Sequence, residues 1–467
     1  ESGGVAGERI LESDQITSVS DVGSGIQSGG VVVLSRLEHL QSDIKVAIVG
    51  TGFMGTSLLY QCSITPGITC VAVADIEPTK AIACLESLKR DYRIVDNLTE
   101  LHEATRQGLV AITEDGDLVA RCRSADVLIE SSSAIGAAGQ VAITALEHRK
   151  HVVMMNAEAD LIFGPYLAHV ARECRVVYTS CDGDQHGVIR HLIDDLRLWG
   201  LRLVMAGNIK GFLDRHANPT TIVPEADERH LTYRMATAFT DGTKLCIEMA
   251  LLANALGLST HVPGMRGPRA CHVGDVFDLF DFDALRETGE PVVDYVLGAE
   301  PDGGVFSVGY CDDGFQQGML SYYKMGDGPY YLFYRPYHLC HIEAMNTVAE
   351  AFLDQRSLLQ PDFGFRTNVY AYAKSDLREG ERLDGIGGYT CYGLIENCAE
   401  NGIRGGLPIC LAEDVTLERA VAKDRKILMS DITYEASRFD FNLYFRAASI
   451  APSQADQVNH AGPGCEQ

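Results

Sequence analysis

Residues 44–62 read IKVAIVGTGFMGTSLLYQC, an apolar run followed by three glycines and a second apolar run. The first run, at 44–49, predicts a buried strand, and the second predicts a helix. Between them, Gly50, Gly52 and Gly55 give the spacing GxGxxG, which in this strand–turn–helix context predicts a dinucleotide-binding turn. The first glycine allows the tight turn, the second lets the backbone approach a pyrophosphate, and the third lets helix and strand pack closely. Free N–H groups at the helix N-terminus would then bind the phosphates.

An acidic residue closes the next predicted strand. Asp75 ends the run CVAVAD, about twenty residues after the last glycine, where a carboxylate binds the ribose hydroxyls of a dinucleotide. This carboxylate would repel the extra phosphate of NADP and favours NAD, whereas Lys80 just beyond it would attract that phosphate, so NAD and NADP are both candidates. Serines at 131–133 end a further strand and are either cofactor contacts or ordinary turn residues. The predicted cofactor-binding set is Gly50, Thr51, Gly52, Phe53, Met54, Gly55, Asp75, Lys80, Ser131, Ser132 and Ser133.

Short apolar runs alternate with helical segments from residue 44 to 182, which is typical of a parallel sheet with crossover helices. The sequence therefore predicts an α/β fold with a Rossmann-type, doubly wound parallel sheet. Its 467 residues are enough for two to four domains. We expect five segments: an N-terminal arm with a short helix at 1–43, a dinucleotide-binding domain at 44–182, a catalytic and dimerisation domain at 183–345, a small β-rich domain at 346–450 and a polar tail at 451–467.

Composition narrows the classes of partner. The 64 Asp and Glu residues outnumber the 39 Lys and Arg residues, giving a formal net charge of -25. An acidic surface repels nucleic acid and anionic lipid, so neither is an expected partner, and no apolar stretch reaches the roughly 20 residues that span a bilayer. The fourteen cysteines are irregularly spaced and include no CxxC pair, which favours reduced thiols in a cytoplasmic protein. The expected partner is a small molecule.

Two strand ends carry dense polar groups. One is Asn156-Ala157-Glu158-Ala159-Asp160, and the other is the run CDGDQHG at 181–187, which includes Asp184, Gln185 and His186. Ligands of an open parallel sheet collect beyond the carboxyl ends of its strands, so these residues are candidate substrate or proton-relay groups. Clustered carboxylates also suit a divalent metal, for which Asp182, Asp184 or Glu158 are candidate ligands. The alternative is helix capping.

Two lysines stand at predicted element ends. Lys210 follows an apolar run and Asn208, where it can hold an anionic or carbonyl-bearing substrate. Lys244 lies in the first turn of a helix after Thr240-Asp241-Gly242-Thr243, where a cation opposes the helix dipole. A cation kept in this unfavourable place indicates function, and Glu248, one turn on, is a candidate partner. Further along, Arg335 and His338 are candidate phosphate or carboxylate contacts or members of a structural turn.

These motifs together resemble a known family. The segments VGTGFMG, VVMMNAEAD, SCDGDQHGV, NIKGFLD, FTDGTK and FYRPYHL, followed by GIGGYTCYG and LPICLAEDVTLERAVAKDRKILMSDI, are similar to homoserine-dehydrogenase-like oxidoreductases with a C-terminal SAF domain. Within that group the chain resembles the second type of deoxyxylulose phosphate reductoisomerase-like enzymes. The resemblance runs from about residue 33 to about residue 450. It implies a catalytic domain that also forms a homodimer, and a SAF-like fold for the C-terminal domain.

The resemblance also implies a reaction. It indicates an NAD(P)H-dependent oxidoreductase acting on a small polar, phosphorylated hydroxy-carbonyl compound, with deoxyxylulose phosphate as the candidate and a divalent metal as a further candidate cofactor. Two alternatives are a homoserine-dehydrogenase-like dehydrogenase of another hydroxy acid or sugar derivative, and a non-catalytic nucleotide-sensing protein. The catalytic candidates are Lys244, Asp241, Lys210 and Glu158, with Asp241 expected to orient Lys244. The predicted substrate-binding set is Asp184, Gln185, His186, Asn208, Lys210, Thr243, Arg335 and His338, with Lys210, Arg335 and His338 forming a basic pocket for phosphate.

Overall fold

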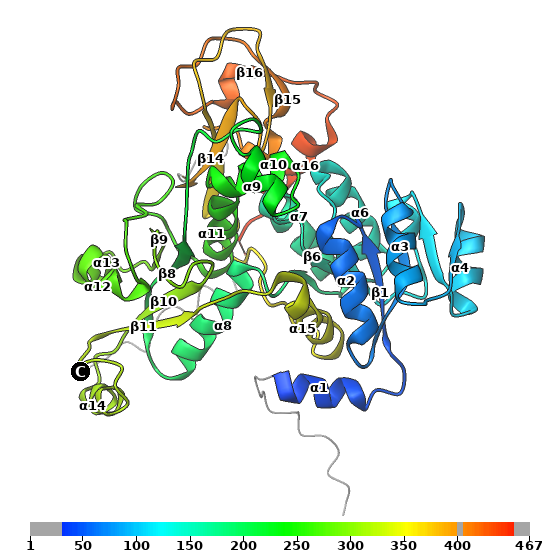
Figure 1. The fold of residues 1–467 in the computed structure, drawn as a ribbon, viewed down its shortest axis with the longest axis horizontal. Helices are drawn as coiled ribbons and strands as arrows, with labels where there is room; N and C mark the ends of the chain where they lie inside the picture. Colours follow the sequence, from blue (N-terminus) through cyan, green and yellow to red (C-terminus); the bar gives the residue numbers. More distant parts are fainter. Residues whose placement is uncertain (1–29, 399–404, 453–467) are drawn as a thin grey trace, which may run out of the picture.

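The computed structural model describes residues 30–398 and 405–452 (Figure 1). The first described helix is α1 (Gly30–Glu38). Most of the predicted N-terminal arm and most of the predicted polar tail lie outside the described residues. Among the helices that are described, none is both long and apolar enough to cross a membrane.

The first sheet has seven strands in the order β3-β4-β2-β1-β5-β6-β7, and every pairing between neighbours is parallel. The residues of β1, β4, β5 and β6 are almost all buried, as expected for strands covered on both faces by helices. This sheet confirms the predicted Rossmann-type α/β fold. Its strands are β1 (Ile44–Val49), β2 (Ile68–Ala74), β3 (Tyr92–Ile94), β4 (Val110–Thr113), β5 (Val127–Glu130), β6 (His151–Met154) and β7 (Tyr178–Ser180).

Six helices alternate with these strands, as crossover connections between parallel strands require. They are α2 (Phe53–Ile64), α3 (Thr79–Ser87), α4 (Leu98–Arg106), α5 (Gly116–Ala120), α6 (Ile135–Glu147) and α7 (Ala157–Cys174). From β1 the chain passes to β2, then to the edge strand β3 and back to β4 between them, before it continues with β5 on the other side of β1. The crevice beyond the carboxyl ends of β1 and β5 is thus the topological switch point, where such sheets bind ligands.

A second, mixed sheet has four strands in the order β11-β10-β8-β9. Here β8 runs parallel to β9 and antiparallel to β10. The strands are β8 (Arg202–Lys210), β9 (Val292–Leu297), β10 (Val305–Tyr310) and β11 (Tyr330–Arg335). The helices of this region are α8 (Gln185–Leu198), α9 (Val223–Glu228), α10 (Tyr233–Thr240), α11 (Thr243–Leu256), α12 (Val276–Leu279), α13 (Phe282–Glu287) and α14 (Gly314–Tyr322), with a 3-10 turn η1 (Val273–Asp275).

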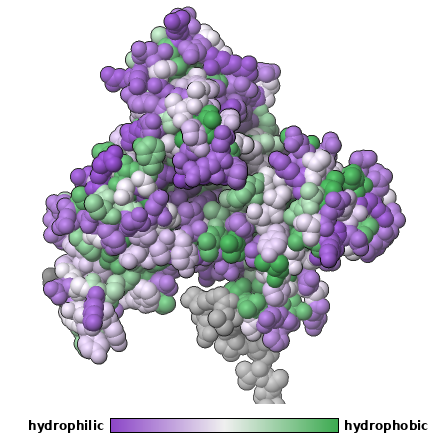
Figure 2. All heavy atoms as spheres, in the orientation of Figure 1, coloured by the Kyte–Doolittle hydropathy of each residue, from purple (hydrophilic) through white to green (hydrophobic). Residues whose placement is uncertain are grey.

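Helix α11 is the central element of the molecule (Figure 1). All of its residues except Lys244 are buried, because it packs against α7 and α8 and against two C-terminal strands, β12 and β14. The C-terminal strands are β12 (Thr367–Ala373), β13 (Arg382–Asp384), β14 (Cys391–Asn397), β15 (Glu413–Leu417) and β16 (Ile432–Thr433), with 3-10 turns η3 (Ile409–Leu411) and η4 (Met429–Asp431). They form one two-stranded and one three-stranded sheet, so the predicted β-rich C-terminal region is present. Its SAF-like fold stays a prediction. Hydrophilic residues cover most of this lobe, at the top of Figure 2.

Two late helices return to the first sheet. Helix α15 (Cys340–Leu353) packs on α2, and its Ala344, Met345 and Val348 share a core with strands of the first sheet. Helix α16 (Phe439–Ala448) packs on α7 and α6. The predicted boundary at residue 345 therefore falls inside α15, because the buried face of that helix belongs to the dinucleotide-binding unit.

The glycine turn lies at the switch point. Gly50 has φ +88, a left-handed conformation that favours glycine. A Cβ atom on Gly55 would overlap the carbonyl oxygen of Gly50, whereas a Cβ atom on Gly52 would meet nothing within 4 Å. The Ser131 hydroxyl donates to the carbonyl oxygens of Val49 (3.0 Å) and Gly50 (2.9 Å), and this ties the end of β5 to the turn. The lack of a side chain at Gly55 thus allows close contact between α2 and the end of β1. The lack of a side chain at Gly52 leaves open space beside the turn.

These two glycines should respond differently to the same substitution. We expect Gly55→Ala to destabilise the fold by about 1–3 kcal/mol, because the added methyl group separates α2 from β1. Gly52→Ala should keep wild-type stability but weaken NADPH binding, since its methyl group occupies the space predicted for the pyrophosphate. Urea unfolding and NADPH fluorescence titration measure the two effects. Unchanged NADPH affinity in a folded Gly52→Ala variant would contradict the predicted cofactor position.

Candidate active site

The predicted dinucleotide turn is connected to the polar centre through a short chain of contacts. A Cβ atom on Gly50 would collide with the backbone of Ser132, so these two segments are in close contact. The side-chain amide of Asn156 donates to the carbonyl oxygen of Ser132 at 2.8 Å, and its oxygen caps α7 by accepting from the N–H of Ala159. Glu158 follows in the first turn of α7. The glycine turn and the acidic end of α7 therefore lie at the same edge of the sheet.

Lys244 forms an ion pair with Glu158, with 2.7 Å between Nζ and Oε1. The lysine belongs to the first turn of α11 and the glutamate to the first turn of α7, and both side chains are mostly buried. Although burial alone would lower the pKa of Lys244, Glu158 raises it above its usual value. Lys244 is thus a protonated hydrogen-bond donor at neutral pH rather than a general base.

Asp241 does not orient Lys244, contrary to the sequence-based prediction. Its buried carboxylate pairs with Lys374 at 2.9 Å and accepts the backbone N–H of Thr243. Thr243, predicted to bind substrate, is fully buried, and its hydroxyl accepts the N–H of Gly393 in β14. Both predictions are corrected: these residues fix the N-terminal end of α11 to the C-terminal region. Glu158 takes the role predicted for Asp241, since the fold brings α7 against α11.

Glu248, one helical turn beyond Lys244, is 3% exposed. Burial raises its pKa well above the usual value, and the neighbouring charge of Asp184 adds to this effect. Its Oε2 has no hydrogen-bond partner among the described residues. The predicted role of Glu248 as partner of Lys244 belongs to Glu158 instead. Glu248 is a buried acid with hydrogen-bonding capacity to spare.

Asp184 caps α8, where its Oδ1 accepts from the N–H of Gln185 at 2.9 Å. Burial alone would raise the pKa of Asp184. The nearby His186, His338 and Lys244 more than offset this, and its pKa lies below the usual value. Asp184 therefore caps α8 and also contributes an ionised carboxylate to the candidate site. Asp182 is different, because it pairs with His191 at 3.0 Å and is removed from the candidate metal ligands.

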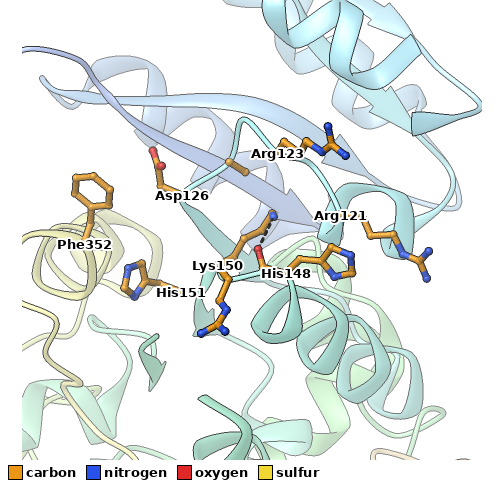
Figure 3. Close-up of a pocket in the computed structure, with 9 residues that line it drawn as sticks. Arg121, Arg123, Asp126, His148, Lys150, His151 and Phe352 are labelled. Atoms are coloured by element: carbon orange, nitrogen blue, oxygen red, sulfur yellow. Dashed lines mark hydrogen bonds between the residues drawn. The ribbon is translucent and has the colours of Figure 1, made fainter. Parts of the chain in front are cut away.

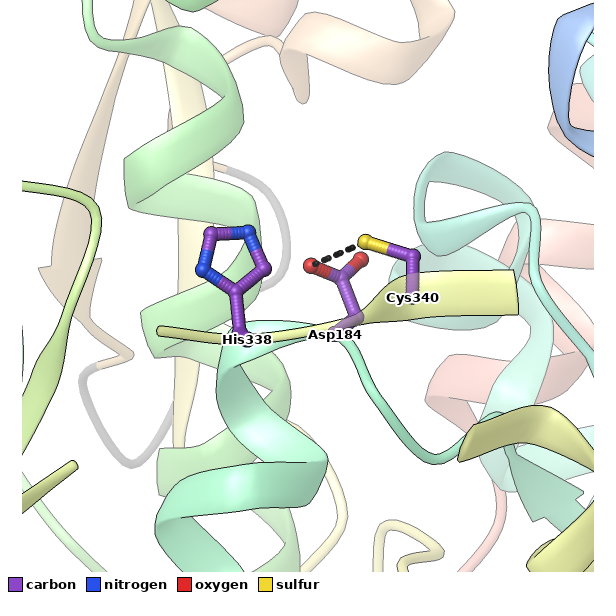
Figure 4. A group of neighbouring side chains, drawn as sticks. All are labelled: Asp184, His338 and Cys340. Atoms are coloured by element: carbon purple, nitrogen blue, oxygen red, sulfur yellow. Dashed lines mark hydrogen bonds between the residues drawn. The ribbon is translucent and has the colours of Figure 1, made fainter. Parts of the chain in front are cut away.

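His338 and Cys340 flank Asp184 (Figure 4). One ligand atom from each of the three residues lies within 4.8 Å of the others. The Nδ1 of His338 is 2.7 Å from the carbonyl oxygen of Gly303, to which it can only donate, and the Sγ of Cys340 is 3.9 Å from Oδ1 of Asp184. Burial raises the pKa of the Cys340 thiol, and Asp184 raises it further. Cys340 is thus a protonated thiol, which sequence reasoning missed because the residue carries no local motif.

The predicted substrate groups on the second sheet share one edge. Backbone pairing aligns Asn208 of β8 and Arg335 of β11 with the same residue, Val305 of β10. The amide of Asn208 donates to the side-chain oxygen of Gln185, and its own Oδ1 has no partner in the described part of the chain. The same holds for Nδ1 of His186, whose pKa is lowered by burial. These buried polar atoms are available to a ligand.

The predicted basic phosphate pocket is not formed as expected. Arg335 pairs with Glu343 at 2.6 Å and stacks over the ring of Tyr337. Lys210 donates to the carbonyl oxygen of Phe239 at 3.0 Å, and burial lowers its pKa. His338 donates to a backbone carbonyl, as described above. The three residues gather at one edge of the second sheet, but each already has a protein partner.

Beside the glycine turn, the carboxylate of Asp75 accepts hydrogen bonds from other residues of the protein. Its Oδ2 accepts from the N–H and the hydroxyl of Thr51, the latter at 2.8 Å, and its Oδ1 accepts from the N–H of Glu77. The other predicted contacts lie around this turn: Phe53, Lys80 and Ser133 are exposed, and Met54 is half-buried. Their cofactor role stays a prediction. Cys181 is buried, and burial raises the pKa of its thiol.

Glu130, which sequence reasoning missed, ends β5 at the same edge and is fully buried. Its Oε1 accepts the N–H of Ser132 at 3.1 Å. Burial raises the pKa of Glu130 to about 8. The sequence pattern places Glu130 at the end of a strand. Its complete burial comes instead from helices that pack on both faces of the sheet.

A pH-dependent stability follows from Glu130. Between about pH 5 and pH 8 the unfolded chain loses this proton while the folded chain keeps it, so the group lowers stability as pH rises. We expect Glu130→Gln to match wild type near pH 5 and to exceed it by on the order of 3 kcal/mol near pH 8. Urea unfolding at both pH values measures this. Exposed Glu103→Gln is the control, and a Glu130→Gln difference that does not change with pH would contradict the assignment.

The central region of the chain matches a known protein family. Residues 183–344 match the family described as "Oxidoreductase DRL, catalytic domain". This match covers α8 to the first residues of α15, including Asp184, Lys244 and His338. It confirms the predicted oxidoreductase class. No curated protein sequence matches the chain.

Solved structures with a similar arrangement are distant in sequence. The 1-deoxy-D-xylulose 5-phosphate reductoisomerase of Zymomonas mobilis, in complex with NADPH, is 15% identical with a TM-score of 0.32 over 45% of this chain and 57% of that chain. A probable dehydrogenase from Thermotoga maritima is 10% identical with a TM-score of 0.38 over 67% and 90%. The scyllo-inositol dehydrogenase of Lactobacillus casei is 14% identical with a TM-score of 0.30 over 58% and 67%. The chain thus spans little more than half of the reductoisomerase, and the Rossmann-type assignment rests on its own strand order, with the oxidoreductase class resting on residues 183–344.

Proposed function

We propose that the chain is an NAD(P)H-dependent oxidoreductase that reduces the carbonyl group of a small polar compound, with deoxyxylulose phosphate as the first candidate. The observation that carries this proposal is the ion pair between Lys244 and Glu158, which lies beyond the edge of the sheet that bears the glycine turn. The family match over residues 183–344 supports the reaction class. The homodimer implied by the family resemblance stays a prediction.

The residues present fit a dinucleotide. The open space at Gly52 and the N-terminus of α2 suit a pyrophosphate, and the bound cofactor would supply hydride to a carbonyl carbon. The choice between NAD and NADP depends on Asp75 and Lys80. Asp75 is held by Thr51 and Glu77, while Lys80 is exposed nearby on α3.

The chain's own groups suit the oxygen of that carbonyl. The ammonium of Lys244 is held protonated by Glu158 and can donate a hydrogen bond or a proton to an oxygen that gains negative charge. Glu248 is buried one helical turn away, and burial raises its pKa well above the usual value, so it is the candidate to replace the proton that Lys244 gives up. The unpartnered atoms of His186 and Asn208 are suited to hydroxyl groups of the substrate.

Of the three predicted metal ligands, only Asp184 is left for a divalent metal. Glu158 is held by Lys244 and Asp182 by His191, which leaves Asp184 with His338 and Cys340. One oxygen, one nitrogen and one sulfur donor fit a borderline cation such as Zn²⁺ better than Mg²⁺, which prefers oxygen ligands. Such an ion would polarise a carbonyl or diol oxygen, and its binding would release the proton of the Cys340 thiol.

The test is oxidation of NADPH with deoxyxylulose phosphate and other carbonyl-bearing sugar phosphates, and reduction of NADP⁺ with hydroxy acids and homoserine, which are alcohols. We expect Lys244→Met to lower kcat by about 100-fold or more while NADPH affinity is unchanged, because the lost donor acts on the substrate oxygen. Glu158→Gln should lower kcat less and shift its pH profile, since the lysine then loses its charged partner.

Exposed Lys423→Met is the matched control and should retain wild-type kinetics. Wild-type turnover by Lys244→Met would overturn the catalytic assignment. Absence of both NADPH oxidation and NADP⁺ reduction with every compound of the panel, by a protein that binds NADPH, would favour the nucleotide-sensing alternative.

A further inference from the structure

A cavity of about 400 Å³ opens at the opposite edge of the first sheet (Figure 3). Residues 121–126 and 148–151 form its walls, and these segments lead into the amino ends of β5 and β6. They lie side by side because β5 and β6 are paired, parallel neighbours. Phe352 of α15 closes one side. Since the glycine turn follows the carboxyl end of β1, this cavity is separate from the candidate active site.

The cavity is strongly basic. Its lining contains six basic side chains and one carboxylate, that of Asp126, in a chain whose formal net charge is -25. Asp126 is already used, because its Oδ2 accepts the backbone N–H of Lys45 at 2.9 Å. The six basic residues are Arg121, Arg123, His148, Arg149, Lys150 and His151. The mutual repulsion of grouped cations costs free energy unless an anion offsets it.

The arginines of the cavity differ in their partners. Arg121 pairs with Asp117 at 2.7 Å, and Arg149 donates to the carbonyl oxygen of Cys174. The guanidinium of Arg123 has no hydrogen bond or ion pair with any residue of the described chain. An exposed, unpaired guanidinium beside other cations offers a planar set of donors for a phosphate or carboxylate.

Lys150 adds a buried cation to this cavity. It is 3% exposed, and its only hydrogen bond within the described residues runs from Nζ to the carbonyl oxygen of His148 at 3.4 Å (Figure 3). An ammonium group has three donors, so at least two are unused in a place where water is largely excluded. Burial lowers the pKa of Lys150, and the charge of Asp126 offsets this only in part. A bound anion would add negative charge beside Lys150.

We propose that this cavity binds a small anion that carries at least two negative charges on phosphate groups. Four cationic side chains favour a charge of this size, and the volume is within the range of small-molecule sites, about 300–1,000 Å³. Lys150 supplies a buried ammonium donor, and Arg123 supplies the paired N–H donors of an exposed guanidinium. The site is formed at the amino ends of β5 and β6, with Phe352 of α15 at one side, and is independent of the proposed reaction.

Inorganic pyrophosphate is the probe, and isothermal titration calorimetry at low salt is the measurement. Pyrophosphate can also bind the glycine turn, so the titrations use a Gly52→Asp background. A Cβ atom at Gly52 meets nothing within 4 Å, and the added carboxylate repels phosphate there. We expect this variant to keep one binding event that weakens as salt is raised.

In that background, Arg123→Ala and Lys150→Met should each weaken pyrophosphate binding by about tenfold or more. The exposed Arg382→Ala, on the C-terminal region, should leave it unchanged. Thermal unfolding of each variant without pyrophosphate shows whether the fold is intact, and Arg123→Ala gives the answer should Lys150→Met unfold. No binding in the Gly52→Asp background, or equal affinity in Arg123→Ala and the background protein, would overturn the proposal.

Discussion

The ion pair between Lys244 and Glu158 joins the two halves of the molecule. Glu158 begins α7, which crosses the first sheet, and Lys244 begins α11, on which the second sheet and the C-terminal strands pack. Taking two charges out of water is costly, and the geometry must be good for their attraction to offset the loss of hydration. A change in the relative position of α7 and α11 would leave two mostly buried charges unpaired. The packing of the two units and the chemistry of the centre therefore depend on each other.

Burial divides the centre into charged and neutral groups. Lys244 and Asp184 keep their charges because each has neighbours of opposite sign. Glu248 and Cys340 hold their protons because burial and nearby carboxylates disfavour their anions. Pairs of acids and bases whose pKa values are moved apart by their environment are typical of proton-transfer sites. The centre of this acidic protein thus contains both charged and neutral groups, as the proposed reaction requires.

The two edges of the first sheet have opposite chemistry. Its carboxyl edge carries Asp75, Glu130 and Glu158 around the glycine turn, and its amino edge carries the basic residues of the cavity near Lys150. Parallel strands cause this separation, because every βα loop lies at one edge and every αβ loop at the other. A single sheet can therefore hold two sites with different electrostatic character and no shared residue.

The sequence by itself determined the strands, helices and turns whose formation depends on neighbouring residues. The strand–glycine–helix order of residues 44–62 predicted the Rossmann-type sheet and its turn, because apolar periodicity and glycine spacing are properties of neighbouring residues. It also singled out Lys244, since a lysine in the first turn of a helix opposes the helix dipole. Tertiary structure alone decided which acid is its partner. Asp241 is close to Lys244 in sequence but pairs with Lys374, while Glu158, 86 residues away from Lys244 (244 − 158), meets it where α7 and α11 pack. The same holds for Glu130, Cys340 and Lys150, because burial and long-range contacts come from elements far apart along the chain.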